Sequence, residues 1–130
     1  MVFMISQPMR GLNSKDILET RARAVEKLRS KGHEVLSQED VSTLVGNDLS
    51  PAKMAILGIK NTSVYWLSES LDLMSRCDGV YFCDGWNDGD HPGCQIEYTV
   101  ALLYGLEMKF ESGGPCNLFL QTEMHATPGD

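Results

Sequence analysis

The most constraining feature of the sequence is a short apolar run, "GVYFC" at residues 79–83, that directly follows a stretch with helical spacing. In that stretch, apolar residues recur at Val64, Leu67, Leu71 and Met74, as they do on one face of a helix. The run itself has no polar face, which is typical of a strand covered on both sides of a sheet. We therefore expect a parallel sheet whose strands are joined by helices.

The amino-terminal third repeats this alternation. Residues 2–6, "VFMIS", form an apolar run that predicts a strand. Asn13 or Ser14 can cap the helix that follows, and Gly32 can end it. The next run, "HEVLS" at 33–37, predicts a second short strand.

The remaining segments are less regular. "SPAKMAILG" at 50–58 predicts a short helix that Ser50 caps and a glycine ends, within an otherwise irregular stretch. A further helix is expected in 91–105. "CNLFL" at 116–120 predicts the last strand, and residues from about 122 to 130 read as a tail.

Size and charge limit the function classes. A chain of 130 residues fits one domain, 1–130, and its net charge of -7 argues against binding a nucleic-acid polymer. The apolar runs are too short to cross a membrane, and the amino terminus lacks a signal-peptide pattern, so we expect a cytoplasmic protein. The four cysteines form no CxxC pair, and we expect neither metal nor organic cofactor. Cys94, at a helix start, is a minor candidate nucleophile.

Two polar loops follow predicted strands, at the edge of a parallel sheet where ligands usually bind. The loop after the first strand offers donors suited to a phosphate or carboxylate, although an ordinary solvent-exposed turn would look similar. Its candidate ligand-binding residues are Ser6, Gln7, Arg10 and Gly11.

The loop after the apolar run 79–83 is acidic. It places Asp84, Asp88 and Asp90 close together, a set suited to sugar hydroxyls or, without a regular ligand spacing, to a divalent metal. Trp86 in the same loop could stack on a flat ring, or it could simply pack in the core.

The predicted helix in 91–105 carries an acidic residue, Glu97, among apolar neighbours. Ile96, Val100, Leu103 and Tyr104 fall in one arc of this helix, and Glu97 projects beside that arc. One interpretation is a first-turn glutamate that complements the helix dipole while its carboxylate reaches solvent. The other is a functional carboxylate held in a cleft.

Three segments together resemble one family. "MISQPMRGL", "WLSESLDLMSRCDGVYFCDGW" and "GCQIEYTVALLYG" are similar to the small phage and bacterial proteins grouped as nucleoside 2-deoxyribosyltransferase-like, over most of residues 2–108. The resemblance implies an α/β fold: a flavodoxin-like or Rossmann-like three-layer sandwich with a mainly parallel sheet of about five strands. It also implies a homodimer or higher homo-oligomer.

The resemblance implies a reaction as well. Enzymes of this wider group, which includes deoxynucleoside 5'-monophosphate N-glycosidases, make and break the bond between a sugar and a base with a glutamate nucleophile. Glu97 occupies that place, with Gly93 and His91 in the preceding turn as substrate-binding residues. His91 stands where an acidic residue is usual, and Asp90 or Asp88 could substitute for it.

The first loop also departs from the pattern, because Ser6 and Gln7 stand where many deoxyribosyltransferases carry an aromatic residue. Arg10 matches instead the arginine of the monophosphate glycosidases. We therefore expect a nucleoside or nucleotide as substrate. A catalytically inactive nucleotide-binding or sensing module of the same fold is the alternative.

Overall fold

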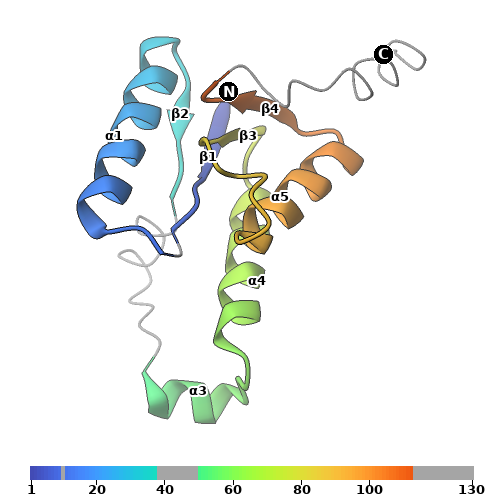
Figure 1. Cartoon of the computed structure of the whole chain (residues 1–130). Helices are drawn as coiled ribbons and strands as arrows, with labels where there is room; N and C mark the ends of the chain where they lie inside the picture. Colours follow the sequence, from blue (N-terminus) through green and yellow to red (C-terminus); the bar gives the residue numbers. More distant parts are fainter. Residues whose placement is uncertain (10, 38–49, 113–130) are drawn as a thin grey trace.

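The structure is a computed structural model that describes residues 1–9, 11–37 and 50–112. Strands and helices alternate along the chain, as predicted (Figure 1). In chain order the elements are β1 (Val2–Ser6), α1 (Ser14–Ser30), β2 (Glu34–Val35), α3 (Pro51–Leu57), α4 (Thr62–Met74), β3 (Gly79–Phe82), α5 (Pro92–Leu103) and β4 (Glu107–Phe110).

The strands form one sheet in the order β2-β1-β3-β4, and every neighbouring pair is parallel. The predicted α/β fold with a parallel sheet is confirmed, but the described residues contain four strands rather than about five. The strand expected at 116–120 and the tail from 122 lie outside the described residues. β4 was not predicted, because "EMKF" is a short run without the continuous apolar residues that indicated β3.

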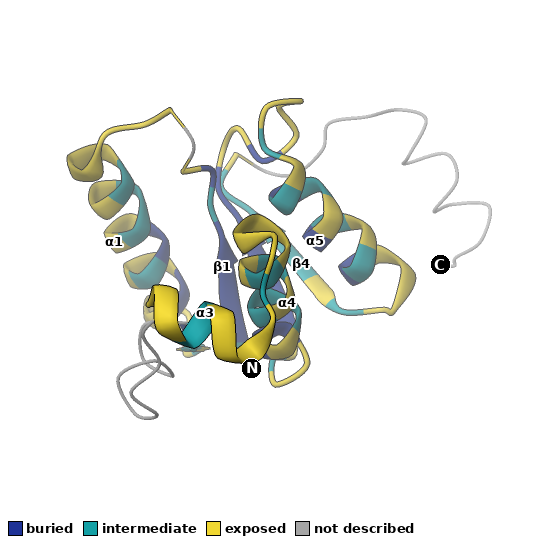
Figure 2. Ribbon diagram, turned by 90° about the horizontal axis from the view of Figure 1, so that it is seen from below, coloured by how far each residue is buried: buried dark blue, intermediate teal, exposed yellow. Residues whose placement is uncertain are grey.

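Each face of the sheet carries its own core. Successive side chains of a strand point to opposite faces. Phe3 and Ile5 of β1 therefore pack with α1, whereas Met4 packs with α4 and α5. The sheet thus lies between α1 on one side and α4 with α5 on the other, which gives three layers (Figure 2). In that view β1 is dark blue, and the outward faces of these helices are largely exposed.

The predicted helix ends are confirmed by their capping contacts. Asn13 accepts a hydrogen bond from the Asp16 amide, and Ser50 accepts one from the Lys53 amide. Gly58 ends α3 with a φ of 72°, a left-handed conformation that suits glycine. These ends follow from local side chains, which is why the sequence alone predicted them.

The start of β3 needs a glycine for lack of space. A Cβ atom on Gly79 would lie 2.5 Å from the Phe3 ring and 2.6 Å from the carbonyl oxygen of Glu107. Beside it, a carboxylate oxygen of Asp78 accepts a 2.7 Å hydrogen bond from the Val2 amide. The start of β3 therefore packs closely against both neighbouring strands, β1 and β4.

No helix among the described residues is long and apolar enough to span a membrane.

Candidate functional site

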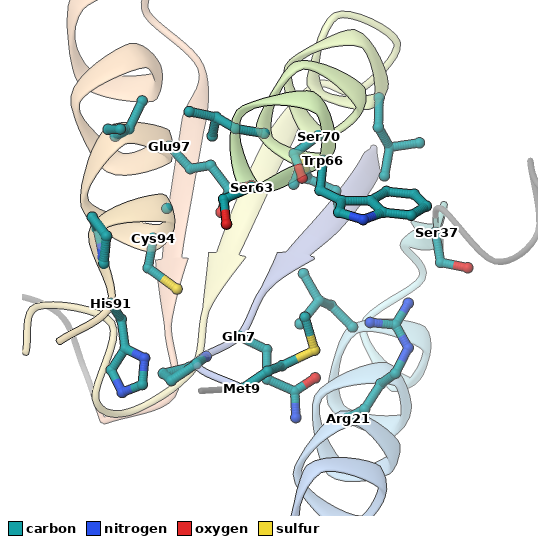
Figure 3. A pocket seen from close by; sticks show the side chains of 18 of the residues that line it. Gln7, Met9, Arg21, Ser37, Ser63, Trp66, Ser70, His91, Cys94 and Glu97 are labelled. Atoms are coloured by element: carbon teal, nitrogen blue, oxygen red, sulfur yellow. The ribbon is translucent and has the colours of Figure 1, made fainter. Parts of the chain in front are cut away.

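A cavity of about 650 Å³ lies at the carboxyl end of β1. In the sheet, β2 lies on one side of β1, whereas β3 and then β4 lie on the other side. The strand order therefore reverses between β1 and β3. The walls come from the loop after β1, one side of α1, the segment after β2, α4 and the start of α5 (Figure 3).

Glu97 lines this cavity from the buried face of α5. That face consists of Cys94, Glu97 and Ala101, whose spacing of three and four residues places them on one side of the helix. The Glu97 side chain is only 7% exposed. Ser6 at the end of β1 donates a 2.6 Å hydrogen bond to its Oε1, and the Ser70 hydroxyl of α4 is a second hydrogen-bond partner.

The structure corrects our reading of the α5 faces. The apolar arc noted in the sequence does not form the buried face, because Leu103 and Tyr104 are 72% and 78% exposed. The small side chains of Cys94 and Ala101 let the other face approach the sheet closely. Glu97 is therefore carried inward, and the interpretation in which its carboxylate reaches solvent is wrong.

Burial shifts the pKa values of the two ionisable side chains on this face of α5, Glu97 and Cys94. It raises the pKa of Glu97 above the ordinary value of 4.5, while the hydrogen bonds from Ser6 and Ser70 oppose the rise by favouring the carboxylate. Burial also raises the pKa of Cys94 to about 11, so its thiol stays protonated near neutral pH. Because thiolates are the nucleophilic form, these surroundings do not favour Cys94 as a nucleophile.

Only part of the first loop faces the cavity. Gln7 lines it, and the Gln7 amide donates a 2.6 Å hydrogen bond to the Ile17 carbonyl, which ties the loop to α1. Ser6 reaches the site through its contact with Glu97. Gly11 is exposed and not among the cavity-lining residues, and Arg10 lies outside the described residues.

The acidic loop is divided in the same way. Asp90, His91 and Gly93 line the cavity, and His91 precedes α5 without using its side chain as a cap. Asp88 instead accepts a hydrogen bond from the Asp90 amide within the loop. Asp84 accepts a 2.7 Å hydrogen bond from Ser112 and does not line the cavity.

Trp86 packs in the core, which is one of the two interpretations that the sequence left open. It is 9% exposed, and its ring centroid lies 4.5 Å from that of Tyr98 and 5.4 Å from that of Phe82. Its rings belong to the core on the α5 face of the sheet, so it offers no free surface to a ligand.

Sequence reasoning missed several residues of the cavity wall, among them Arg21, Trp66 and Ser70. The sequence held a signal for Arg21 and for Ser70. Arg21 interrupts the apolar stripe of α1, four residues after Ile17, and Ser70 lies three residues after Leu67 of the α4 stripe. A polar residue on an inward helix face indicates either a partner or a cleft.

The described residues contain no group of three or more His, Cys, Asp or Glu side chains arranged to hold a metal ion. No protein-family model, no curated protein and no solved structure matches this chain.

Proposed function

We propose that this protein breaks, or exchanges, the N-glycosidic bond of a nucleoside or nucleoside 5'-monophosphate. The observation that carries the proposal is the Glu97 carboxyl group, buried in the wall of a cavity and held by a 2.6 Å hydrogen bond from Ser6. A buried acidic group in a cleft is a candidate catalytic residue, because its hydrogen bonds fix the carboxyl group in place and burial shifts its pKa.

In the proposed first step, a Glu97 carboxylate oxygen bonds to C1' of the sugar as the bond from C1' to the base nitrogen breaks. The electron pair of that bond leaves with the base, which takes up a proton. Water, or the nitrogen of a second base, then attacks C1' on the face that the base left and releases Glu97 with overall retention. Ser6 and Ser70 stabilise the ionised form that must attack.

His91 and Asp90 are the candidates for delivering the proton and holding sugar hydroxyls, because both line the cavity beside the start of α5. An imidazole ring and a carboxyl group can each transfer a proton to a departing base. Asp84 and Asp88 have no catalytic role in this reaction and Trp86 does not bind the substrate, since their described contacts lie elsewhere. A phosphate role for Arg10 stays a prediction.

The fold supports this proposal. The strand order β2-β1-β3-β4 equals the first four strands of a flavodoxin-like sheet, in which ligands bind at the switch point between β1 and β3. The cavity lies beside that point. Together with the resemblance to nucleoside 2-deoxyribosyltransferase-like proteins, this favours a nucleoside over other ligands of similar size.

The test is release of free base from a panel of nucleosides and 5'-monophosphates, followed by chromatography. Glu97→Gln keeps the size of the side chain but removes the attacking charge, so base release should fall on the order of 10³-fold or more. Glu107→Gln, an exposed glutamate on β4, is the matched control and should retain the parental rate. Parental base release by Glu97→Gln would overturn the mechanism.

The alternative is a nucleotide-binding module without turnover. It is favoured by His91, which stands where the resemblance leads us to expect an acidic residue. Ligand-induced thermal stabilisation without any base release, for every member of the panel, would support it.

We also propose a homo-oligomer of at least two subunits. No residue of α3 is buried (Figure 2), and Ile56 and Leu57 on this helix are 83% and 56% exposed. Apolar side chains gathered on an exposed helix are typical of a protein contact. Sedimentation that shows a fully active monomer would contradict this proposal.

A further inference from the structure

The cavity extends beyond Glu97 to an end that the proposed reaction leaves unused. There Arg21 of α1, Trp66 of α4 and Met9 of the first loop line the wall. In Figure 3 Glu97 and Arg21 lie on opposite sides of the cavity, and the Arg21 guanidinium points towards the part where the Trp66 indole lies. We call these three residues the arginine end.

Arg21 has no ion-pair partner within the described part of the chain. The ion pairs found there join Arg23 to Glu111 and Arg76 to Asp72. Arg21 is half-buried where it lines the cavity, so it has given up some water, and no described carboxylate forms an ion pair with it. A group with five N–H donors in a fixed fork is therefore available to a ligand.

Trp66 completes a flat recognition surface. Its side chain is 40% exposed although it lines a cavity, so part of the indole remains open to a ligand. An aromatic face next to an arginine fork suits a planar heterocycle, with the ring against the indole and its edge towards the guanidinium. Arg21 is the one arginine or lysine among the described residues that line the cavity, so a phosphate group would meet a single strong cation here.

We infer that the arginine end binds the nucleobase and selects a 6-oxopurine, such as hypoxanthine or guanine. These bases present two adjacent acceptors, O6 and N7, which match the two donors of the guanidinium fork. Adenine presents a donor at the first of these positions and would leave one N–H without a partner. The inference rests on the proposed function only in taking the ligand to be a nucleoside.

Binding, rather than turnover, tests this inference. Inosine, adenosine and 7-deazainosine, which lacks the N7 acceptor, are titrated calorimetrically into the Glu97→Gln variant, and thermal shifts of the parental protein with the same ligands provide a second measurement. Inosine should bind on the order of tenfold more tightly than adenosine, with 7-deazainosine between them. Quenching of Trp66 fluorescence, measured against a Trp66→Phe variant, reports stacking.

Substitutions of Arg21 then test whether its guanidinium causes the preference for inosine over adenosine. Arg21→Met and Arg21→Lys should both abolish the preference for inosine, because lysine keeps the charge but not the bidentate geometry. Arg29→Met, an exposed arginine on the same helix outside this cavity, should keep it.

Equal affinity of the Glu97→Gln variant for inosine and adenosine, with equal thermal shifts of the parental protein, would overturn the inference. So would an Arg21→Met substitution that weakens all nucleosides equally. A parallel titration with the 5'-monophosphates of inosine and adenosine gives a further test, because a loss confined to the monophosphates would make Arg21 a phosphate ligand. Inosine-selective binding without base release would leave this inference intact and refute the proposed catalysis. Base release that depends on Glu97, without any preference for inosine, would support the proposed catalysis and refute this inference.

Discussion

The hydrogen bond from Ser6 to Glu97 makes a specific prediction about pH dependence. Ser6 is 1% exposed and Glu97 is 7% exposed, so water does not readily replace the hydroxyl when it is removed. Ser6→Ala leaves the carboxyl group in place but deletes the donor that lies 2.6 Å from Oε1. The ionised form of Glu97 loses this stabilisation, whereas the protonated form loses little.

The magnitude follows from the charge on the acceptor. A hydrogen bond to a charged group contributes roughly 1.5–3 kcal/mol, which changes the ratio of ionised to protonated carboxyl groups about 10- to 150-fold. Removing the donor therefore raises the pKa of Glu97 further in the direction that burial already drives it. Because the proposed nucleophile is the carboxylate, the acidic limb of kcat/KM should move to higher pH.

The assay is base release by Ser6→Ala across a pH series, beside two other variants. Ser68→Ala removes a hydroxyl from an exposed position on α4, where it bonds the Tyr65 carbonyl, and should leave the profile unchanged. Ser6→Cys keeps a weak donor of similar size and should give an intermediate displacement.

A Ser6→Ala profile that is lower at every pH but has the same acidic limb would refute this reasoning. It would mean that Ser6 supports the site without stabilising the charge on Glu97. Loss of folding is distinguished by urea denaturation of the same variant.

Three further predictions concern stability and reactivity. Burial raises the pKa of Glu97, so the folded state binds the Glu97 proton more tightly than the unfolded state does. The free energy of unfolding should therefore fall as the pH rises from 4.5 through the pKa of the folded state. Urea denaturation of the Glu97→Gln variant should not show this fall. Cys94→Ala should lower base release by less than about tenfold, because a thiol with a pKa of about 11 supplies almost no thiolate, and a loss of the size expected for Glu97→Gln would make Cys94 the nucleophile. Gly79→Ala should destabilise the fold by about 1–3 kcal/mol through contact with Phe3 and Glu107, whereas Gly89→Ala, which meets nothing within 4 Å, should change stability little; equal unfolding midpoints would contradict this.

Local signals in the sequence determined much of the secondary structure. The caps at Asn13 and Ser50, the stop at Gly58 and the apolar run of β3 depend on residues within a few positions of one another, so they could be read without the fold. The parallel α/β arrangement followed from their alternation. β4 was not predicted, because a four-residue strand with half-buried side chains lacks a continuous apolar run.

Only the tertiary structure decided which residues share the cavity. Ser6 and Glu97 are 91 positions apart, and their contact depends on how closely α5 approaches the sheet. Periodicity identified an apolar arc on α5 but could not tell that the small side chains of Cys94 and Ala101 would turn the opposite face inward. The division between Asp90, which lines the cavity, and Asp84, which bonds Ser112, likewise depends on the path of a loop. Local patterns specify elements, whereas a site depends on packing between elements distant in sequence, and no short-range pattern records that packing.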